Sequence, residues 1–177
     1  MNENPWLRSQ PTDTPVNPVV TTAVPVVPVW GGQNAYVPYE RVLLVGAHAG
    51  AGVSSLSAVT GIAECGFNWG VPSSNDGVVF VARGDMRGLN ALSDAGRAWS
   101  EGRVKGRLLG AVVLADHPKE LKELKTFREF VCRGFPQSWF IPFIDSWRLA
   151  PGSKQGLPKA AVKAFTHLSS LTTTEKR

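Results

Sequence analysis

The chain has 177 residues, of which 43% are hydrophobic and 19% are charged, and its formal net charge is +5. This length and composition exclude two full domains and are typical of one globular domain. No apolar run reaches the roughly 18 residues that a membrane-spanning helix needs, and no secretory signal is evident, so we expect a cytoplasmic protein. Cys65 and Cys132 lie far apart without a CxxC neighbour, which favours reduced, buried thiols over a zinc site or a disulfide.

Residues 1–38 contain seven of the thirteen prolines, in runs such as "TPVNPVVTTAVPVVPVW". Proline lacks a backbone N–H and fixes its own φ angle, so neither a helix nor a central strand tolerates this spacing. We therefore predict a disordered arm over residues 1–38. One domain follows over residues 39–172, and residues 173–177 form a frayed tail.

After residue 38, short apolar runs alternate with longer amphipathic stretches. This alternation is typical of βαβ units, so we predict an α/β fold with three α/β/α layers around a mostly parallel sheet. The expected strands are 41–46, 77–82, 107–116 and 138–143. The first expected helix runs from Ser54 or Ser55 to about Cys65, with Gly66 as its stop, and two others cover 85–102 and 158–171. The helix between these two has Pro118 in its first turn and is expected to bury Leu121, Leu124, Phe127 and Val131.

A loop rich in glycine and alanine follows the first expected strand, within "VLLVGAHAGAGVSSLSAV" at residues 42–59. A strand that leads through small residues into a helix leaves backbone N–H groups around one spot, where the helix dipole favours an anion such as phosphate. Ser54 stands where a hydroxyl could ligate Mg²⁺. The residues expected to bind phosphate are Gly46, His48, Gly50, Ala51, Gly52, Val53, Ser54 and Ser55.

One known pattern for this loop is GxxxGxG, which holds a dinucleotide in short-chain dehydrogenases, and Gly46, Gly50 and Gly52 match it. That family also needs a YxxxK pair downstream. The two tyrosines, Tyr36 and Tyr39, precede the loop instead. An NAD(P)-binding Rossmann protein is therefore a minor alternative.

A second pattern is the P-loop, GxxxxGK[ST], whose length "AHAGAGVS" shares. The loop resembles more closely the deviant Walker A loop of the ParA/MinD family, KGGxGK[ST][ST], which would fall on residues 48–55. The resemblance continues through the strand, helix and strand at 77–116. It reaches "FIPFIDSWRLA" at 140–150, where Pro142 would lie in the turn that approaches the adenine base. It implies a small P-loop NTPase-like fold of a bacterial branch, ATP or ADP with Mg²⁺ as ligand, and a homodimer.

The chain departs from this family at both lysines, whose positions are occupied by His48 and Val53. Without the second lysine, no charge at that position offsets the charge that develops on the β and γ phosphates. The segment between the loop's helix and the next expected strand is also too short for an acidic strand that would hold Mg²⁺. Hydrolysis should therefore be slow or absent.

Four more residues are candidates for contacts with the base or the rim of a ligand. Arg83 and Asp85 follow an expected strand at its carboxyl end, where ligands of open α/β sheets bind. Asp116 also follows an apolar run, and it is either a ligand contact or a helix N-cap. Pro142 is the fourth candidate, by the resemblance.

Two functions remain open at this point, and no catalytic residue is assigned. We favour a regulatory or adaptor protein with weak or no nucleotide hydrolysis, whose arm binds a protein partner. The alternative is an active ATPase that partitions or positions DNA or another cargo. The net charge of +5 makes nucleic acid a minor candidate partner.

Overall fold

The computed structural model describes residues 39–173. The predicted arm at residues 1–38 and the chain after residue 173 lie outside this part. Five strands form one sheet in the order β2-β1-β3-β4-β5, and every neighbouring pair is parallel. The strands are β1 (Arg41–Gly46), β2 (Ala63–Glu64), β3 (Asp76–Arg83), β4 (Arg107–Leu114) and β5 (Ser138–Ile141).

The order of the strands fixes where the chain reverses direction across the sheet. From β1 the chain moves to β2 on one side and then returns to β3 on the other side of β1. This order is a common doubly wound arrangement, and its topological switch point lies between β1 and β3. The carboxyl ends of these two strands are the expected place for a ligand.

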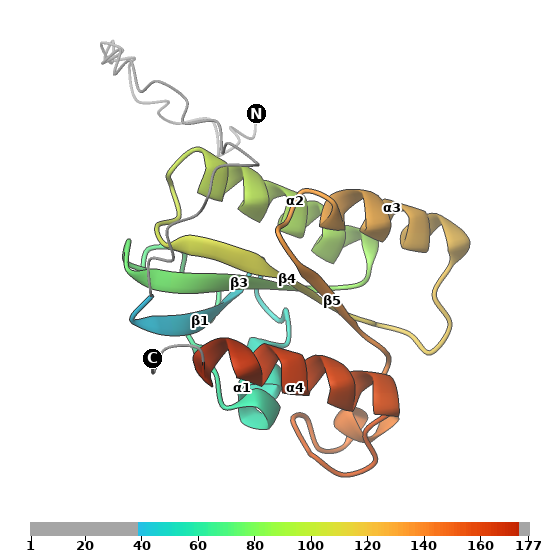
Figure 1. The fold of residues 1–177 in the computed structure, drawn as a ribbon. Helices are drawn as coiled ribbons and strands as arrows, with labels where there is room; N and C mark the ends of the chain where they lie inside the picture. The colour runs from blue at the N-terminus through green and yellow to red at the C-terminus, as the bar shows by residue number, and fades with distance from the viewer. Residues whose placement is uncertain (1–38, 174–177) are drawn as a thin grey trace, which may run out of the picture. The chain divides into compact units, whose positions relative to one another are not determined.

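Helices cover both faces of the sheet, which confirms the three-layer α/β/α prediction. In Figure 1, α2 and α3 lie on one face and α1 and α4 on the other. Among the helices of residues 39–173, none has both the length and the apolar character needed to cross a membrane. The helices are α1 (Val53–Thr60), α2 (Met86–Ser100), α3 (Lys122–Cys132) and α4 (Lys159–Thr173), with a short 3-10 helix η2 (Asp145–Arg148) after β5.

Each face of the sheet has its own hydrophobic core. Side chains alternate along a strand, so Leu44 packs toward α1 and α4, whereas Leu43 and Val45 pack toward α2. Because both faces are buried, β3 and β4 are almost continuously apolar, as is typical of inner parallel strands.

Helix α1 ends at Thr60, so the predicted end at Cys65 is wrong. Gly61 takes a left-handed conformation with φ of 73°, and its N–H donates to the carbonyl oxygen of Ser57 at 2.8 Å. Glycine adopts this conformation without a steric penalty, and it commonly ends helices. The chain after Gly61 is then free to pair with β1 as β2, a strand that the sequence pattern did not indicate.

Helix α3 begins at Lys122, so the prediction that Pro118 lies in its first turn is also wrong. Leu121 is the N-cap of α3, and its side chain is 62% exposed rather than buried. The preceding segment is attached to α3 by Arg128, whose guanidinium donates to both carboxylate oxygens of Glu120, at 2.7 and 2.9 Å. This ion pair replaces the helical turn that the sequence suggested.

A buried carboxylate, which the sequence analysis did not single out, lies at the start of β3. Asp76 is 1% exposed and accepts hydrogen bonds from Arg41 at 2.9 and 3.3 Å. It also accepts bonds from the backbone N–H of Ser73 at 2.7 Å and from the Ser73 hydroxyl at 3.0 Å. The hydrogen bond from Arg41 lowers the pKa of Asp76, so the carboxylate stays ionised in the fold.

Both cysteines are free thiols in the described structure, and both are half-buried rather than fully buried. Burial raises the pKa of the Cys65 thiol and of the Cys132 thiol. Because the thiolate is the reactive form, this shift lowers the reactivity of both side chains.

Candidate functional site

The loop at residues 47–52 joins β1 to α1 at the switch point of the sheet. The N–H of Ala47 donates to the carbonyl oxygen of Val81 at 2.8 Å, which ties the start of the loop to β3. Gly52 is the N-cap of α1 and has a positive φ of 91°. A Cβ at this position would overlap Cδ1 of Leu114, so glycine also allows the loop to pack against β4.

The N-terminus of α1 has donors that the helix does not use. No side chain caps it, and the first intrahelical bond runs from the N–H of Leu56 to the carbonyl oxygen of Gly52 at 3.0 Å. The preceding N–H groups, from Gly52 to Ser55, therefore have no partner within α1. Together with the helix dipole they make this end of α1 favourable for an anion.

His48 connects the loop to the end of β3 instead of extending toward solvent. Its Nε2 accepts a hydrogen bond from the backbone N–H of Arg83 at 3.3 Å, and its Nδ1 lies 2.8 Å from the carbonyl oxygen of Ala49. The geometry requires the tautomer that carries the proton on Nδ1. Both ring nitrogens are therefore occupied by backbone groups.

Val53, at the position of the P-loop lysine, is a core residue. Its side chain is 6% exposed and belongs to the same hydrophobic cluster as Leu56 and Leu114. A lysine here would place its aliphatic stem in this core. The position therefore lacks the lysine charge and in addition serves the packing of the core.

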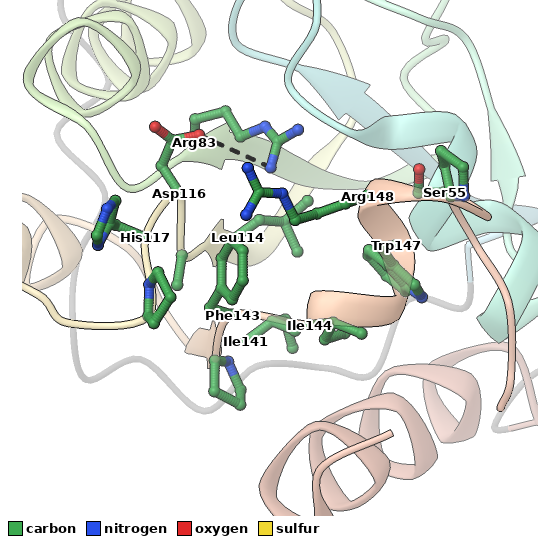
Figure 2. Close-up of a pocket in the computed structure, with 14 residues that line it drawn as sticks. Ser55, Arg83, Leu114, Asp116, His117, Ile141, Phe143, Ile144, Trp147 and Arg148 are labelled. Atoms are coloured by element: carbon green, nitrogen blue, oxygen red, sulfur yellow. Dashed lines mark ion pairs between the residues drawn. The ribbon is translucent and has the colours of Figure 1, made fainter. Parts of the chain in front are cut away.

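A cavity of about 470 Å³ lies beyond the carboxyl ends of β3, β4 and β5 (Figure 2). Helix α1 reaches it through Ser55, and η2 closes another side through Trp147 and Arg148. The remaining lining residues are Arg83, Leu114, Ala115, Asp116, His117, Pro118, Ile141, Pro142, Phe143, Ile144 and Pro151.

Two guanidinium groups, from Arg83 and Arg148, line this cavity and point toward the same region of it in Figure 2. Arg83 makes an exposed ion pair with Asp116 at 4.0 Å, and its Nε lies 3.5 Å from the carbonyl oxygen of Gly50. Within residues 39–173, Arg148 makes no ion pair. Since Asp116 supplies the one carboxylate of the lining, the cavity has excess positive charge and suits an anion.

Another part of the lining is apolar and partly aromatic, with Phe143, Ile144 and Trp147. Trp147 is held in place because its Nε1–H donates to the carbonyl oxygen of Ser153 at 2.9 Å and its ring stacks on Phe165 with centroids 5.9 Å apart. A cavity with a charged side and a fixed aromatic side can bind a ligand that combines an anion with a flat ring.

The structure divides the sequence-predicted residues between different places. Ser55, Arg83, Asp116 and Pro142 line the cavity together. Asp85 does not, because its carboxylate caps α2 by accepting the N–H of Gly88 at 2.6 Å. The remaining phosphate-binding candidates, Gly46, His48, Gly50, Ala51, Gly52, Val53 and Ser54, form the end of β1, the loop and the start of α1 beside the cavity.

Sequence reasoning missed Arg148, Phe143 and His117 as lining residues. A usable signal for Arg148 was its position as a basic residue shortly after the last strand, whose carboxyl end faces the ligand side of the sheet. For Asp116, an N-cap role is excluded, because α3 starts only at Lys122 and has Leu121 as its N-cap.

The residues present do not fit a resident Mg²⁺ ion. Such an ion prefers oxygen ligands that include one or two free carboxylates. The only carboxylate in the lining, Asp116, faces Arg83, and the predicted ligand Ser54 lies outside the lining. In the described part of the chain, no three His, Cys, Asp or Glu side chains gather as a metal site.

The fold and the cavity define a doubly wound α/β protein with a candidate anion-binding site at the carboxyl edge of its sheet. The model of a family of unknown function, DUF6668, matches residues 40–165, and the chain belongs to this family. A search of curated proteins finds no match, and a search of solved structures finds none either.

Proposed function

We propose that this chain binds a phosphorylated, nucleotide-like ligand in the 470 Å³ cavity and acts as a regulatory or adaptor protein of the ParA/MinD-like type. One observation carries the proposal. Ser55, in the first turn of the uncapped helix α1, lines the same cavity as Arg83 and Arg148. A helix N-terminus and two guanidinium groups are a favourable combination for phosphate oxygens.

The proposed ligand has its phosphate at the charged side of the cavity and its base at the aromatic side. Guanidinium groups bind phosphate in a bidentate manner, and Phe143 and Pro142 offer a flat, apolar surface for a ring. The cavity volume lies in the range of roughly 300–1,000 Å³ that small-molecule sites have. The ligand would thus contact residues that follow several strands of the sheet.

Hydrolysis is expected to be weak or absent, because Val53 takes the place of the lysine that stabilises charge during phosphoryl transfer. Release of inorganic phosphate from ATP, measured with the full chain, should equal or only slightly exceed the rate without protein. A faster release that Ser55→Asp removes would favour the active ATPase instead.

Calorimetric titration of ATP, ADP and AMP into the full chain, with and without Mg²⁺, tests binding. We expect Ser55→Asp to weaken binding at least tenfold, because a carboxylate in the first turn of α1 repels phosphate. The fold should tolerate it, since acidic residues stabilise helix N-termini. Ser55→Asn is the matched neutral control and should retain most of the affinity.

The two arginines provide a second, independent arm of this test. Arg83→Gln and Arg148→Gln should each weaken binding about tenfold or more, since each removes a charge-assisted hydrogen bond. Arg97→Gln on the solvent side of α2 is the control, because its only ion pair is a loose, exposed contact with Asp94 at 3.9 Å. Absence of heat with all three nucleotides, or equal affinities in all variants, would refute the proposal.

A further inference from the structure

A second cavity, of about 390 Å³, lies next to the first and has a different character. It is bounded by the turn between β3 and α2, by the segment that follows β4 and by the first turns of α3. Its lining residues are Gly84, Asp85, Ala115, Asp116, His117, Lys119, Glu120, Leu121 and Leu124. Residues 115–117 line both cavities and therefore form the wall between them.

The carboxylates of this lining already have partners. Asp85 accepts the N–H of Gly88 at 2.6 Å, and Asp116 faces Arg83 at 4.0 Å. Glu120 accepts two hydrogen bonds from Arg128, which is itself held over the ring of Phe140 at 4.0 Å. These groups are arranged to hold the walls together, not to receive a cation.

The surface of this cavity that remains free to contact a ligand is mostly apolar. Leu121 is 62% exposed at this cavity, and Leu124 is half-buried beneath it against the core on the α2 side. A large apolar side chain exposed at the edge of a cavity gains free energy when a ligand covers it. The volume again lies within the range of small-molecule sites.

Asp116 and Glu120 face arginines, and Asp85 is the N-cap of α2, where the helix dipole offsets its charge. In the described part of the chain, Lys119 is then the one charged side chain of this lining without a partner. The first turn of α3 has no side-chain cap, so its free N–H groups add to this potential, and the acidic Glu123 of the same turn lines a different surface. The charged group that stays free to meet a ligand is therefore Lys119, and its complement is a single negative charge.

We propose that the second cavity binds a small apolar monoanion, an acyl carboxylate or an aryl sulfonate. Its hydrocarbon part covers Leu121 and Leu124, and its charged group faces Lys119. This site shares the wall of residues 115–117 with the first cavity but needs no nucleotide there, so the inference does not rest on the nucleotide proposal.

Two probes test the site with the full chain: anilinonaphthalene sulfonate, followed by its fluorescence, and decanoate, followed by its displacement of the dye. We expect one saturable dye site per chain that decanoate displaces and that saturating ADP, directed at the first cavity, leaves occupied. Leu121→Ala should weaken it about tenfold through lost apolar contact, and Lys119→Glu about fivefold or more through charge reversal. Both positions are exposed, so both variants should fold normally.

Two matched controls on α3 separate this site from unspecific dye binding. Phe130→Ala removes an apolar side chain that is 70% exposed but lines a different surface, and Lys125→Glu reverses a charge outside the cavity. Both should leave the affinity unchanged. Binding that does not saturate, that decanoate does not displace, or that responds to Phe130→Ala but not to Leu121→Ala would overturn the proposal.

Discussion

Gly88→Ala is expected to lower the free energy of unfolding by about 3 kcal/mol, the upper end of what overpacking costs. Gly88 lies in the first turn of α2, against the last residue of β3. An added Cβ would overlap the carbonyl oxygen of Arg83 and lie only 2.9 Å from its carbonyl carbon and 3.0 Å from its nitrogen. Backbone in a sheet cannot move aside as a side chain can, because Arg83 pairs with Leu114 of β4.

Urea unfolding followed by circular dichroism measures this effect, and Gly96→Ala in the same helix is its control. There the added Cβ would meet Cζ of Phe135 at 3.1 Å, and that ring can shift. Alanine also favours a helix over glycine by up to about 1 kcal/mol. Gly96→Ala should therefore change stability by no more than about 1 kcal/mol. Equal urea midpoints for Gly88→Ala and the natural chain would show that α2 is not held tightly against β3.

Asp76→Ala is expected to destabilise the fold by about 3 kcal/mol, the lower end of the cost of breaking a buried ion pair. The substitution removes the acceptor for Arg41 and for the N–H and hydroxyl of Ser73. Arg41 is partly exposed and can regain water, which limits the loss. Urea unfolding at neutral pH measures it. Asp94→Ala, at an exposed position in a loose pair, should change stability by less than about 0.5 kcal/mol.

The same carboxylate should determine part of the acid sensitivity of the fold. Its pKa is lowered in the folded state by the hydrogen bond from Arg41, so the unfolded chain binds this proton at higher pH than the folded chain does. The stability that Asp76 contributes is fully present above its ordinary pKa of about 4 and is lost as the pH falls through its lowered value. Asp76→Asn should flatten this decline in unfolding free energy below about pH 5. An unchanged acid profile would contradict the assignment.

The sequence predicts the inner sheet well, because β3 and β4 are almost continuously apolar and lie between loops rich in glycine and polar residues. The sequence fails to predict where helices begin and end when a single residue determines the boundary. Gly61 and Gly66 both take positive φ, but only Gly61 ends the helix, because the chain beyond it pairs with β1. Pro118 suggests a helix start, yet the pair of Glu120 and Arg128 keeps that segment outside α3.

For the candidate site, the sequence identifies groups that follow strands but not which of them share a cavity. Arg83 and Asp116 are found because they directly follow apolar runs. Arg148 comes from η2, and its approach depends on how the chain turns after β5, which no local pattern encodes. Val53 matches a motif position in the sequence but packs in the core, because side-chain direction at the start of a helix depends on what the helix covers.

The lengths of the strands bear on how copies of this chain meet one another. In the described sheet, the two outer strands are the shortest: β2 has two residues and β5 has four, whereas β3 and β4 have eight each. A short outer strand has few free backbone N–H and C=O groups with which a strand of a neighbouring chain could pair. These edges therefore disfavour aggregation through added strands. A homodimer of the described domain would accordingly form through helices and side chains rather than through one continuous sheet.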